Sequence, residues 1–259
     1  MNGFDFQIEG RIARILLNRP EDQNLLSRDL LLSLQTVASD LAASPDIQVL
    51  TIIGEGTECF SVGILTPALR GQLGKDDVLK LIRLANETFD AIEALPQIVI
   101  AGLNGYARAG AVELILACDI RIAAEHARLS SPEAKWGGFP GAGAPVRLPD
   151  IIGAGRALEL LCTCREIDAT EMERIGLIER KVSKDGVHAE INRLASAIAE
   201  NGPLATRGAK RIVKSRMESD FRAARELSDA LRAALEWTDD VDEGIAAARE
   251  GRKPRFTGR

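Results

Sequence analysis

Residues 104–119 read NGYARAGAVELILACD. The apolar run before them, IVIAGL at 98–103, is typical of a buried strand, and the apolar residues after the turn are typical of a helix carrying one carboxylate, Glu113. The first N–H groups of a helix have no partner within it, and the aligned peptides place about half a positive charge there. Small residues at 109–111 let a ligand approach the backbone. The stretch therefore predicts either an anion-binding turn or, with equal weight, a purely structural connection with Glu113 in the first helical turn.

Composition and charge restrict the class of protein. The chain has 259 residues, of which 46% are hydrophobic and 27% charged, as expected for one large or two small domains with a sizeable core. A formal net charge of −5 and a pI near 5.3 argue against nucleic acid or an anionic membrane as the main partner. No signal peptide, transit sequence or apolar run of about 18 residues is visible. We expect a cytoplasmic protein.

Metal and redox chemistry have little support in the sequence. The four cysteines form no Cys-x-x-Cys pair, and the two histidines, His126 and His188, are far from any cluster of other ligands. A zinc site or a Ser-His-Asp triad is therefore not expected. We predict no metal and no separate cofactor, so that any catalyst would consist of carboxylates and backbone N–H groups.

The pattern of elements changes along the chain. Strands and helices alternate in short units at first, whereas helical periodicity prevails from about residue 158. We place a boundary between an α/β core, residues 1–195, and a C-terminal helical segment, residues 196–259. That segment is too thin to bury itself and must pack on the core or on a neighbouring chain. Its apolar stripe includes Leu227, Ala230, Leu231, Ala234 and Leu235.

Short motifs occur in a fixed order along nearly the whole chain. They are Leu17-Asn18-Arg19-Pro20 with Asn24, Phe60-Ser61-Val62-Gly63, Asn104-Gly105-Tyr106, Cys118-Asp119, Pro132-Glu133, Pro140-Gly141-Ala142-Gly143 and Arg252-Lys253-Pro254-Arg255-Phe256. In this order and spacing the chain resembles the crotonase superfamily, the enoyl-CoA hydratase/isomerase proteins. Each motif alone is a weak signal, and together they indicate the superfamily without selecting one reaction.

The resemblance implies a fold, an assembly and a substrate class. The fold would be α/β, a crotonase-like spiral of β-β-α repeats followed by helices that build a homotrimer or a dimer of trimers. The substrate would be an acyl-CoA thioester, with coenzyme A as part of the substrate. Two backbone N–H groups, those of Ile64 and Gly110, would form an oxyanion hole for the thioester carbonyl. The motifs also imply a set of substrate-binding residues, namely Arg19, Asn24, Ser61, Gly63, Leu65 and Gly141.

Hydratases of the superfamily use two glutamates, which match Glu113 and Glu133. By resemblance, Glu133 would exchange the proton at C2 and Glu113 would hold and help to activate the water that adds to C3. An acid and a base in one pocket each contribute about 10²–10⁴ to such a rate. An isomerase can work with one carboxylate, so the presence of both favours hydration.

Some positions depart from the usual hydratase pattern. Leu65 stands where hydratases usually have aspartate, and Ala109-Gly110-Ala111 stands where they usually have three glycines. Neither change removes a backbone donor. Residues 139–143 contain no carboxylate, unlike the dehalogenases of the superfamily. Three hypotheses remain: a hydratase, an isomerase or CoA-thioester/β-diketone hydrolase, and a catalytically silent oligomeric binding protein. Arg147 is interpreted as a solvated or paired structural charge.

Overall fold

The computed structural model describes residues 3–136, 138, 140–218, 238–250 and 252–259. Within this part of the chain, six strands form a larger sheet in the order β1-β2-β3-β5-β7-β10, and four form a smaller sheet in the order β4-β6-β8-β9. The larger sheet consists of β1 (Phe4–Glu9), β2 (Ile12–Leu17), β3 (Val49–Gly54), β5 (Ile98–Leu103), β7 (Ile120–Ala124) and β10 (Arg180–Val182). The smaller sheet consists of β4 (Cys59–Ser61), β6 (Tyr106–Arg108), β8 (Arg128–Ser130) and β9 (Ile167–Asp168).

The chain alternates between the two sheets, which confirms the predicted spiral of β-β-α units. Strands β3, β5 and β7 of the larger sheet lead directly into β4, β6 and β8 of the smaller one, and a helix follows each pair. The pairings β2–β3, β3–β5 and β5–β7 are parallel. Parallel strands are covered on both faces, and all six residues of β3 are accordingly buried. The first two strands of the larger sheet, β1 and β2, form an antiparallel hairpin.

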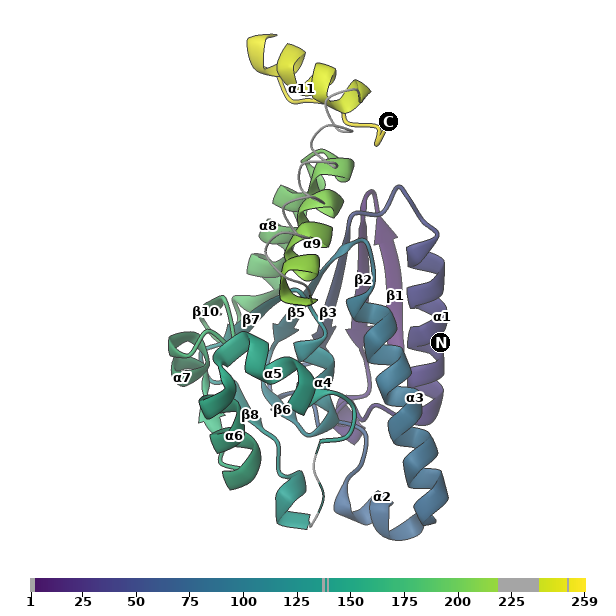
Figure 1. The fold of residues 1–259 in the computed structure, drawn as a ribbon, viewed down its shortest axis with the longest axis vertical. Helices are drawn as coiled ribbons and strands as arrows, with labels where there is room; N and C mark the ends of the chain where they lie inside the picture. The colour runs from purple at the N-terminus through teal and green to yellow at the C-terminus, as the bar shows by residue number, and fades with distance from the viewer. Residues whose placement is uncertain (1–2, 137, 139, 219–237, 251) are drawn as a thin grey trace.

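Helices cover both faces of the larger sheet (Figure 1). Helix α8 (Val187–Ala199) packs on one face, where Gly102 of β5 lies against Ile191. Successive residues of a strand point to opposite faces, so Ala101 points the other way. On that side lie α3 (Lys75–Glu93), which packs against α1 (Arg28–Ala42), and the short α4 (Gly110–Leu116).

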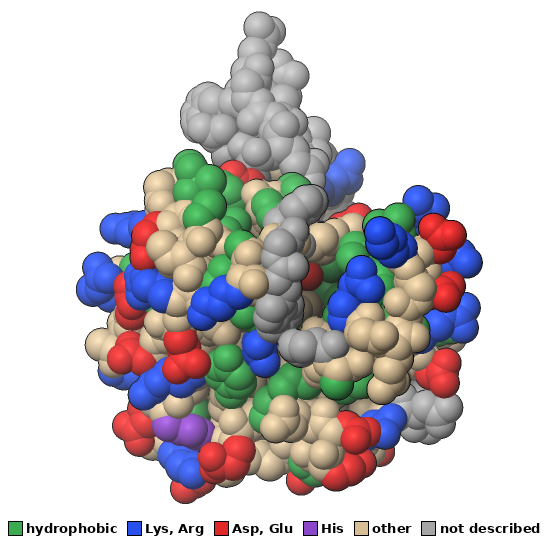
Figure 2. All heavy atoms as spheres, turned by 90° about the horizontal axis from the view of Figure 1, so that it is seen from below, with side chains coloured by type: hydrophobic (Ala, Val, Ile, Leu, Met, Phe, Trp, Pro, Cys, Tyr) green, Lys and Arg blue, Asp and Glu red, His purple; other side chains and the backbone are tan. Residues whose placement is uncertain are grey.

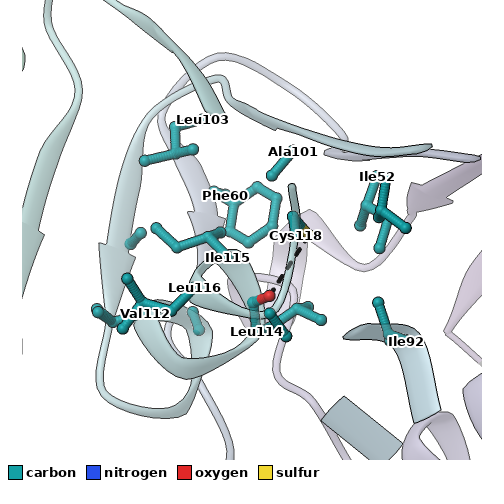
Figure 3. Packing of buried hydrophobic residues seen from close by; sticks show 14 of the residues in the cluster. Ile52, Phe60, Ile92, Ala101, Leu103, Val112, Leu114, Ile115, Leu116 and Cys118 are labelled. Atoms are coloured by element: carbon teal, nitrogen blue, oxygen red, sulfur yellow. Dashed lines mark hydrogen bonds between the residues drawn. The ribbon is translucent and has the colours of Figure 1, made fainter. Parts of the chain in front are cut away.

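The core between the sheets and α4 is apolar (Figure 3). Phe60 is fully buried, and Ala101 and Ile115 lie next to it in that view, with Ile52 farther to the right. The Cys118 thiol lies in the same cluster and donates to the carbonyl of Leu114 at 3.5 Å. Helix α4 is therefore surrounded by hydrophobic side chains, although it carries the carboxylate of Glu113 in its first turn.

The remaining helices lie at the periphery. Their bounds are α2 (Pro67–Gln72), α5 (Ala144–Ile152), α6 (Ala154–Thr163), α7 (Ala169–Arg174), α9 (Pro203–Glu218), α11 (Asp239–Glu250) and the 3₁₀ turns η1 (Pro20–Asp22) and η2 (Glu133–Trp136). Helix α11 lies apart from the sheets in Figure 1, and the tail after it runs near the β1–β2 turn and the C-terminal end of α8. There the Arg11 guanidinium donates to the carbonyl of Phe256, and Lys253 pairs with Glu200 at 3.0 Å.

Ser27 is the N-cap of α1, and its hydroxyl accepts a hydrogen bond from the N–H of Leu30 at 3.3 Å. The proposed division at residue 195 falls within α8 and remains a prediction. The apolar stripe at 227–235 lies outside the described residues. Among the described helices, none combines the length and apolar character needed to cross a bilayer. Charged side chains of both signs occupy the face in Figure 2, and hydrophobic ones reach the surface between them.

Candidate active site

The first turn of the site follows β4 and is held by a buried serine. Gly63 has a φ of +89°, a conformation that favours glycine. Its N–H donates to the Ser61 hydroxyl at 3.0 Å, and that hydroxyl donates to the carbonyl of Asn24 at 2.7 Å. The carbonyl of Gly63 in turn accepts from the N–H of Leu26 at 2.9 Å. The next N–H, that of Ile64, has no acceptor among the residues that the structure describes.

The second turn joins β6 to α4. Ala109 adopts φ 52° and ψ −125°, a sparsely populated conformation for a residue with a side chain. Its N–H donates to the carbonyl of Ser130 at 3.0 Å, and its carbonyl accepts from Val112 N–H at 2.8 Å. Gly110 begins α4, and its N–H likewise has no acceptor within the described part of the chain.

The two turns lie against each other. A methyl group at Gly63 would lie 2.6 Å from the nitrogen of Gly110, and one at Gly110 would lie 3.1 Å from the nitrogen of Ile64. The same methyl group at Gly110 would lie 2.5 Å from the Ile64 side chain, which fills the space beside the glycine. Both positions therefore need glycine, and the N–H groups of Ile64 and Gly110, which have no acceptor among the residues described, lie close together.

Glu113 lies in the first turn of α4 and is 3% exposed. Its Oε1 accepts hydrogen bonds from the N–H groups of Ala142 at 2.6 Å and Ala144 at 3.2 Å. Burial raises the pKa of Glu113 to about 7, and the charge of Glu133 adds to this rise. The N–H groups of Ala144 and Ala142 and the charge of Arg147 oppose it.

Glu133 begins η2 and has a different environment. Its Oε2 is buried and has no hydrogen-bond partner among the described residues. Burial raises the pKa of Glu133 to about 7, while its own N–H and the charge of Arg108 lower it. Since the charge of Glu133 acts on Glu113, the fold has brought together two carboxyl groups that are 20 residues apart in sequence, and both titrate near neutral pH.

The other predicted site residues surround these turns in different ways. Asn24 is 1% exposed and binds protein groups, since its Oδ1 accepts from Arg19 N–H at 3.0 Å and its Nδ2 donates to Cys59 O at 3.1 Å. The Arg19 side chain is partly exposed and pairs with Asp22. Leu65 is partly buried and packs against the core. Roles of these residues, and of Ser61, Gly63 and Gly141, in binding substrate remain predictions.

Sequence reasoning missed the contacts that hold the turn beside Glu113. The Asn86 amide donates to the carbonyl of Gly141 at 2.6 Å, and Arg147 donates to the carbonyl of Ala142 at 3.2 Å. Arg147 is a paired charge, as interpreted from the sequence, but its pairing lies directly against the site. The signal in the sequence is the spacing of polar residues on the helix that contains Asn86.

Comparisons with known proteins confirm the family. A sequence model described as Enoyl-CoA hydratase/isomerase matches residues 7–259, and the chain belongs to this family and is an enzyme of it. It is 34% identical to a crotonyl-CoA hydratase of Syntrophomonas wolfei, over 96% of this chain and 95% of that protein. It is 32% identical to a mitochondrial methylglutaconyl-CoA hydratase of Mus musculus, over 93% of this chain and 78% of that protein. The crystal structure of an enoyl-CoA hydratase from Bacillus anthracis superposes with a TM-score of 0.96, at 34% identity and full coverage of both chains.

Proposed function

We propose that the protein adds water across the C2–C3 double bond of a 2-enoyl-CoA thioester. The observation that carries this proposal is the pair Glu113 and Glu133, two neighbouring carboxyl groups whose pKa values are both raised to about 7. A group with a pKa near the working pH can serve as an acid or a base with little cost. The hydratase names of the relatives described above support the same reaction.

The backbone donors of Ile64 and Gly110 would bind the thioester carbonyl. When a nucleophile adds at C3, negative charge develops on that oxygen. A preorganised donor there lowers the activation free energy by about 2.7–4 kcal/mol. Both N–H groups lack a protein acceptor in the described chain, and the two turns are in contact. The peptide that carries the N–H of Ile64 is held through its own carbonyl, that of Gly63, which accepts from the N–H of Leu26 at 2.9 Å. The Ser61 hydroxyl fixes the preceding peptide by accepting from the N–H of Gly63.

The two carboxyl groups would divide the proton transfers. Glu113 as a carboxylate would hold the water and take its proton as the oxygen bonds to C3, while Glu133 as the acid would deliver a proton to C2. Oε1 of Glu113 is already bound by two N–H groups, which fixes the orientation of this carboxylate. Oε2 of Glu133, which has no hydrogen-bond partner among the described residues, would be left to exchange a proton with the substrate.

Arg19, Asn24, Ser61, Gly63, Leu65 and Gly141 would form the walls around the bound thioester. Leu65 places an apolar side chain where hydratases usually have aspartate. Coenzyme A would belong to the substrate, so that no separate cofactor takes part. Two alternatives use the same site. The first is an enoyl-CoA isomerase or a CoA-thioester/β-diketone hydrolase, and the second is a catalytically silent oligomeric binding protein.

The test is to replace each glutamate by glutamine, which keeps the shape and cannot shuttle a proton. For hydration of crotonyl-CoA, we expect each single variant to lose about 10²–10⁴ in kcat with little change in KM. Glu87→Gln on the exposed side of α3 is the matched control and keeps the wild-type rate. Exchange of the C2 proton with deuterium is measured on the same proteins.

The outcomes separate the three hypotheses. An isomerase would lose C2 exchange in Glu133→Gln and keep it in Glu113→Gln. A binding protein would show no turnover in the wild type. A Glu113→Gln protein that hydrates crotonyl-CoA at the wild-type rate would falsify the mechanism with two carboxylates.

A further inference from the structure

One face of α3 holds the turn that binds Glu113. Ile82, Asn86, Asp90 and Glu93 follow one another at helical spacing and therefore lie on the same face. The amide of Asn86 donates to the carbonyl of Gly141 at 2.6 Å. Ile82 packs so closely there that a methyl group at position 141 would lie 2.9 Å from its Cγ2. The first half of this face thus fixes the start of the turn at residues 141–144.

Arg147 connects the second half of the same face to the same turn. Its Nε donates to Oε2 of Glu93 at 2.6 Å, and its guanidinium also forms an ion pair with Asp90. A further guanidinium N–H donates to the carbonyl of Ala142 at 3.2 Å. A methyl group at Gly143 would lie 1.9 Å from the guanidinium, so the glycine makes room for it. Only 8% of the Arg147 side chain is exposed.

Arg147 and Glu113 bind the same residue from two sides. The carbonyl of Ala142 accepts from Arg147, and the N–H of Ala142 donates to Oε1 of Glu113 at 2.6 Å. Movement of Ala142 would therefore move the carboxylate. A lysine could not replace this contact, because three acceptors around one planar guanidinium need the fixed fork of arginine.

The geometry points to Arg147 as a positioning residue for Glu113. Arg147 forms ion pairs with Asp90 and Glu93, and in this position it holds Ala142 and, through Ala142, the carboxylate of Glu113 in one orientation. The inference rests on the proposed hydration for its kinetic consequence. A reacting carboxylate must be placed within a fraction of an ångström, and a misplacement of about 1 Å can cost about 10² in rate.

The charges around Glu113 predict the direction of the effect. Glu133 on η2 raises the pKa of Glu113, whereas Arg147 on α5 lowers it. Asp90 and Glu93 on α3 pair with Arg147, and Arg108 on β6 lowers the pKa of Glu133. Loss of Arg147 removes a positive charge and loosens the N–H donors of the turn. Both changes raise the pKa of Glu113.

The variants are Arg147→Met and Arg147→Lys. Glu93 keeps a partner in both, because Lys214 of α9 binds it at 2.9 Å. We expect the kcat of hydration to fall about 10- to 100-fold in Arg147→Met with KM within about twofold. The acid limb of the kcat profile moves to higher pH, because Glu113 must lose its proton before it acts as the base. Arg147→Lys restores the charge without the fork and gives a smaller loss.

A second readout needs no substrate. Glutamate labelled with carbon-13 at the side-chain carboxyl reports each titration by NMR, and Glu113→Gln identifies the resonance of Glu113. We expect this resonance to titrate at higher pH in Arg147→Met than in the wild type. If the wild type does not hydrate enoyl-CoA but the titration still depends on Arg147, the proposed function is wrong and the positioning role is supported.

Arg121→Met is the matched control. Arg121 is also a buried arginine, 6% exposed, and its guanidinium binds Glu179 and the carbonyls of Leu177 and Cys118, each at 2.7 Å. Its loss should lower stability and leave the Glu113 titration unchanged. An unchanged titration in folded Arg147→Met, or an equal shift in Arg121→Met, overturns the inference. If Arg147→Met does not fold, Asn86→Ala takes its place, with a smaller shift in the same direction expected and no shift overturning the inference.

Discussion

At the scale of single residues, the two site carboxyl groups have similar pKa values for unequal reasons. Burial is the largest cause for both Glu113 and Glu133. Glu113 retains two N–H donors that favour its charged form, whereas Oε2 of Glu133 has no partner in the described chain. The two N–H donors of Glu113 lie on a turn that Asn86 and Arg147 hold. A substitution that moves this turn therefore changes the pKa of Glu113 even when the carboxyl group stays buried.

The raised pKa of Glu113 predicts how stability depends on pH. The folded protein keeps this proton up to a pH of about 7, whereas the unfolded chain releases it near 4.5. The native state thus binds more protons between these values, and the free energy of unfolding falls as the pH rises through this window. The expected fall is about 3 kcal/mol for this group. Below pH 4.5 its full contribution is present.

Urea unfolding at about pH 5 and about pH 8 measures this dependence. In Glu113→Gln the side chain has no proton to release, so the difference between the two pH values shrinks by about 3 kcal/mol. Glu87→Gln, at an exposed position of α3, keeps the wild-type difference. Equal pH dependence in Glu113→Gln and the wild type would contradict the prediction.

Part of the site could be predicted at this scale and part could not. The turn at 109–111 and the glutamate in the first helical turn follow from local sequence, since small residues and a carboxylate have definite uses there. The donor at Ile64 was implied only by the resemblance to the superfamily. The side chains that support the turn beside Glu113 could not be predicted in this way. Asn86 and Arg147 contact residues or turns 54 or 55 positions away in sequence, and no local pattern specifies which loop a polar side chain on a helix will meet.

At the scale of elements, the packing of α8 on the larger sheet depends on one glycine. A methyl group at Gly102 of β5 would lie 2.1 Å from Cδ1 of Ile191 and 2.9 Å from Cγ1 of Val187. Contacts this short force side chains or the helix to move. Helix α8 can therefore approach β5 only because position 102 carries no side chain.

Gly102→Ala should cost about 1–3 kcal/mol of unfolding free energy, because the methyl group overpacks the contact. Ile191→Val removes the nearest methyl group and should recover part of the loss when combined with Gly102→Ala. A double-mutant cycle measured by urea unfolding gives the coupling between the two sites. Gly155→Ala in α6, where no atom lies within 4 Å, is the control and should be neutral or stabilising. If the changes in unfolding free energy of Gly102→Ala and Ile191→Val simply add in the double variant, the predicted clash does not exist.

The elements themselves were predicted unevenly. The buried strand at 98–103 and the helices after about residue 158 follow from sequence, because burial imposes a clear pattern on them. Strand β1 was missed, although Phe4–Glu9 alternates apolar and polar residues. Helix α5 was missed because it starts in a glycine-rich loop and contains Pro149. Proline in a short helix removes a hydrogen bond and hides the helical signal.

At the scale of the whole molecule, we predict a homotrimer or a dimer of trimers. Val146 on α5, Leu158 on α6 and Val213 on α9 are 76%, 62% and 59% exposed in the single chain. Another copy would shield such side chains at little cost. Light scattering at micromolar concentration should give about three or six times the mass of one chain, 27.9 kDa. A monomer at that concentration would contradict the prediction.

The order of strands in both sheets follows the order of the chain, with each turn of the spiral bound to the turns before and after it. A molecule built this way can open from its ends inward, much as a stack loses its outer layers first. Strand β1 has a largely exposed outer edge, and β10 pairs with β7 over only three residues. Amide protons of β1 and β10 should therefore exchange with deuterium well before those of β3 and β5. Hydrogen exchange followed by mass spectrometry would show protection that rises from both edges to the middle of the sheet, and uniform protection would mean that the spiral opens only as one unit.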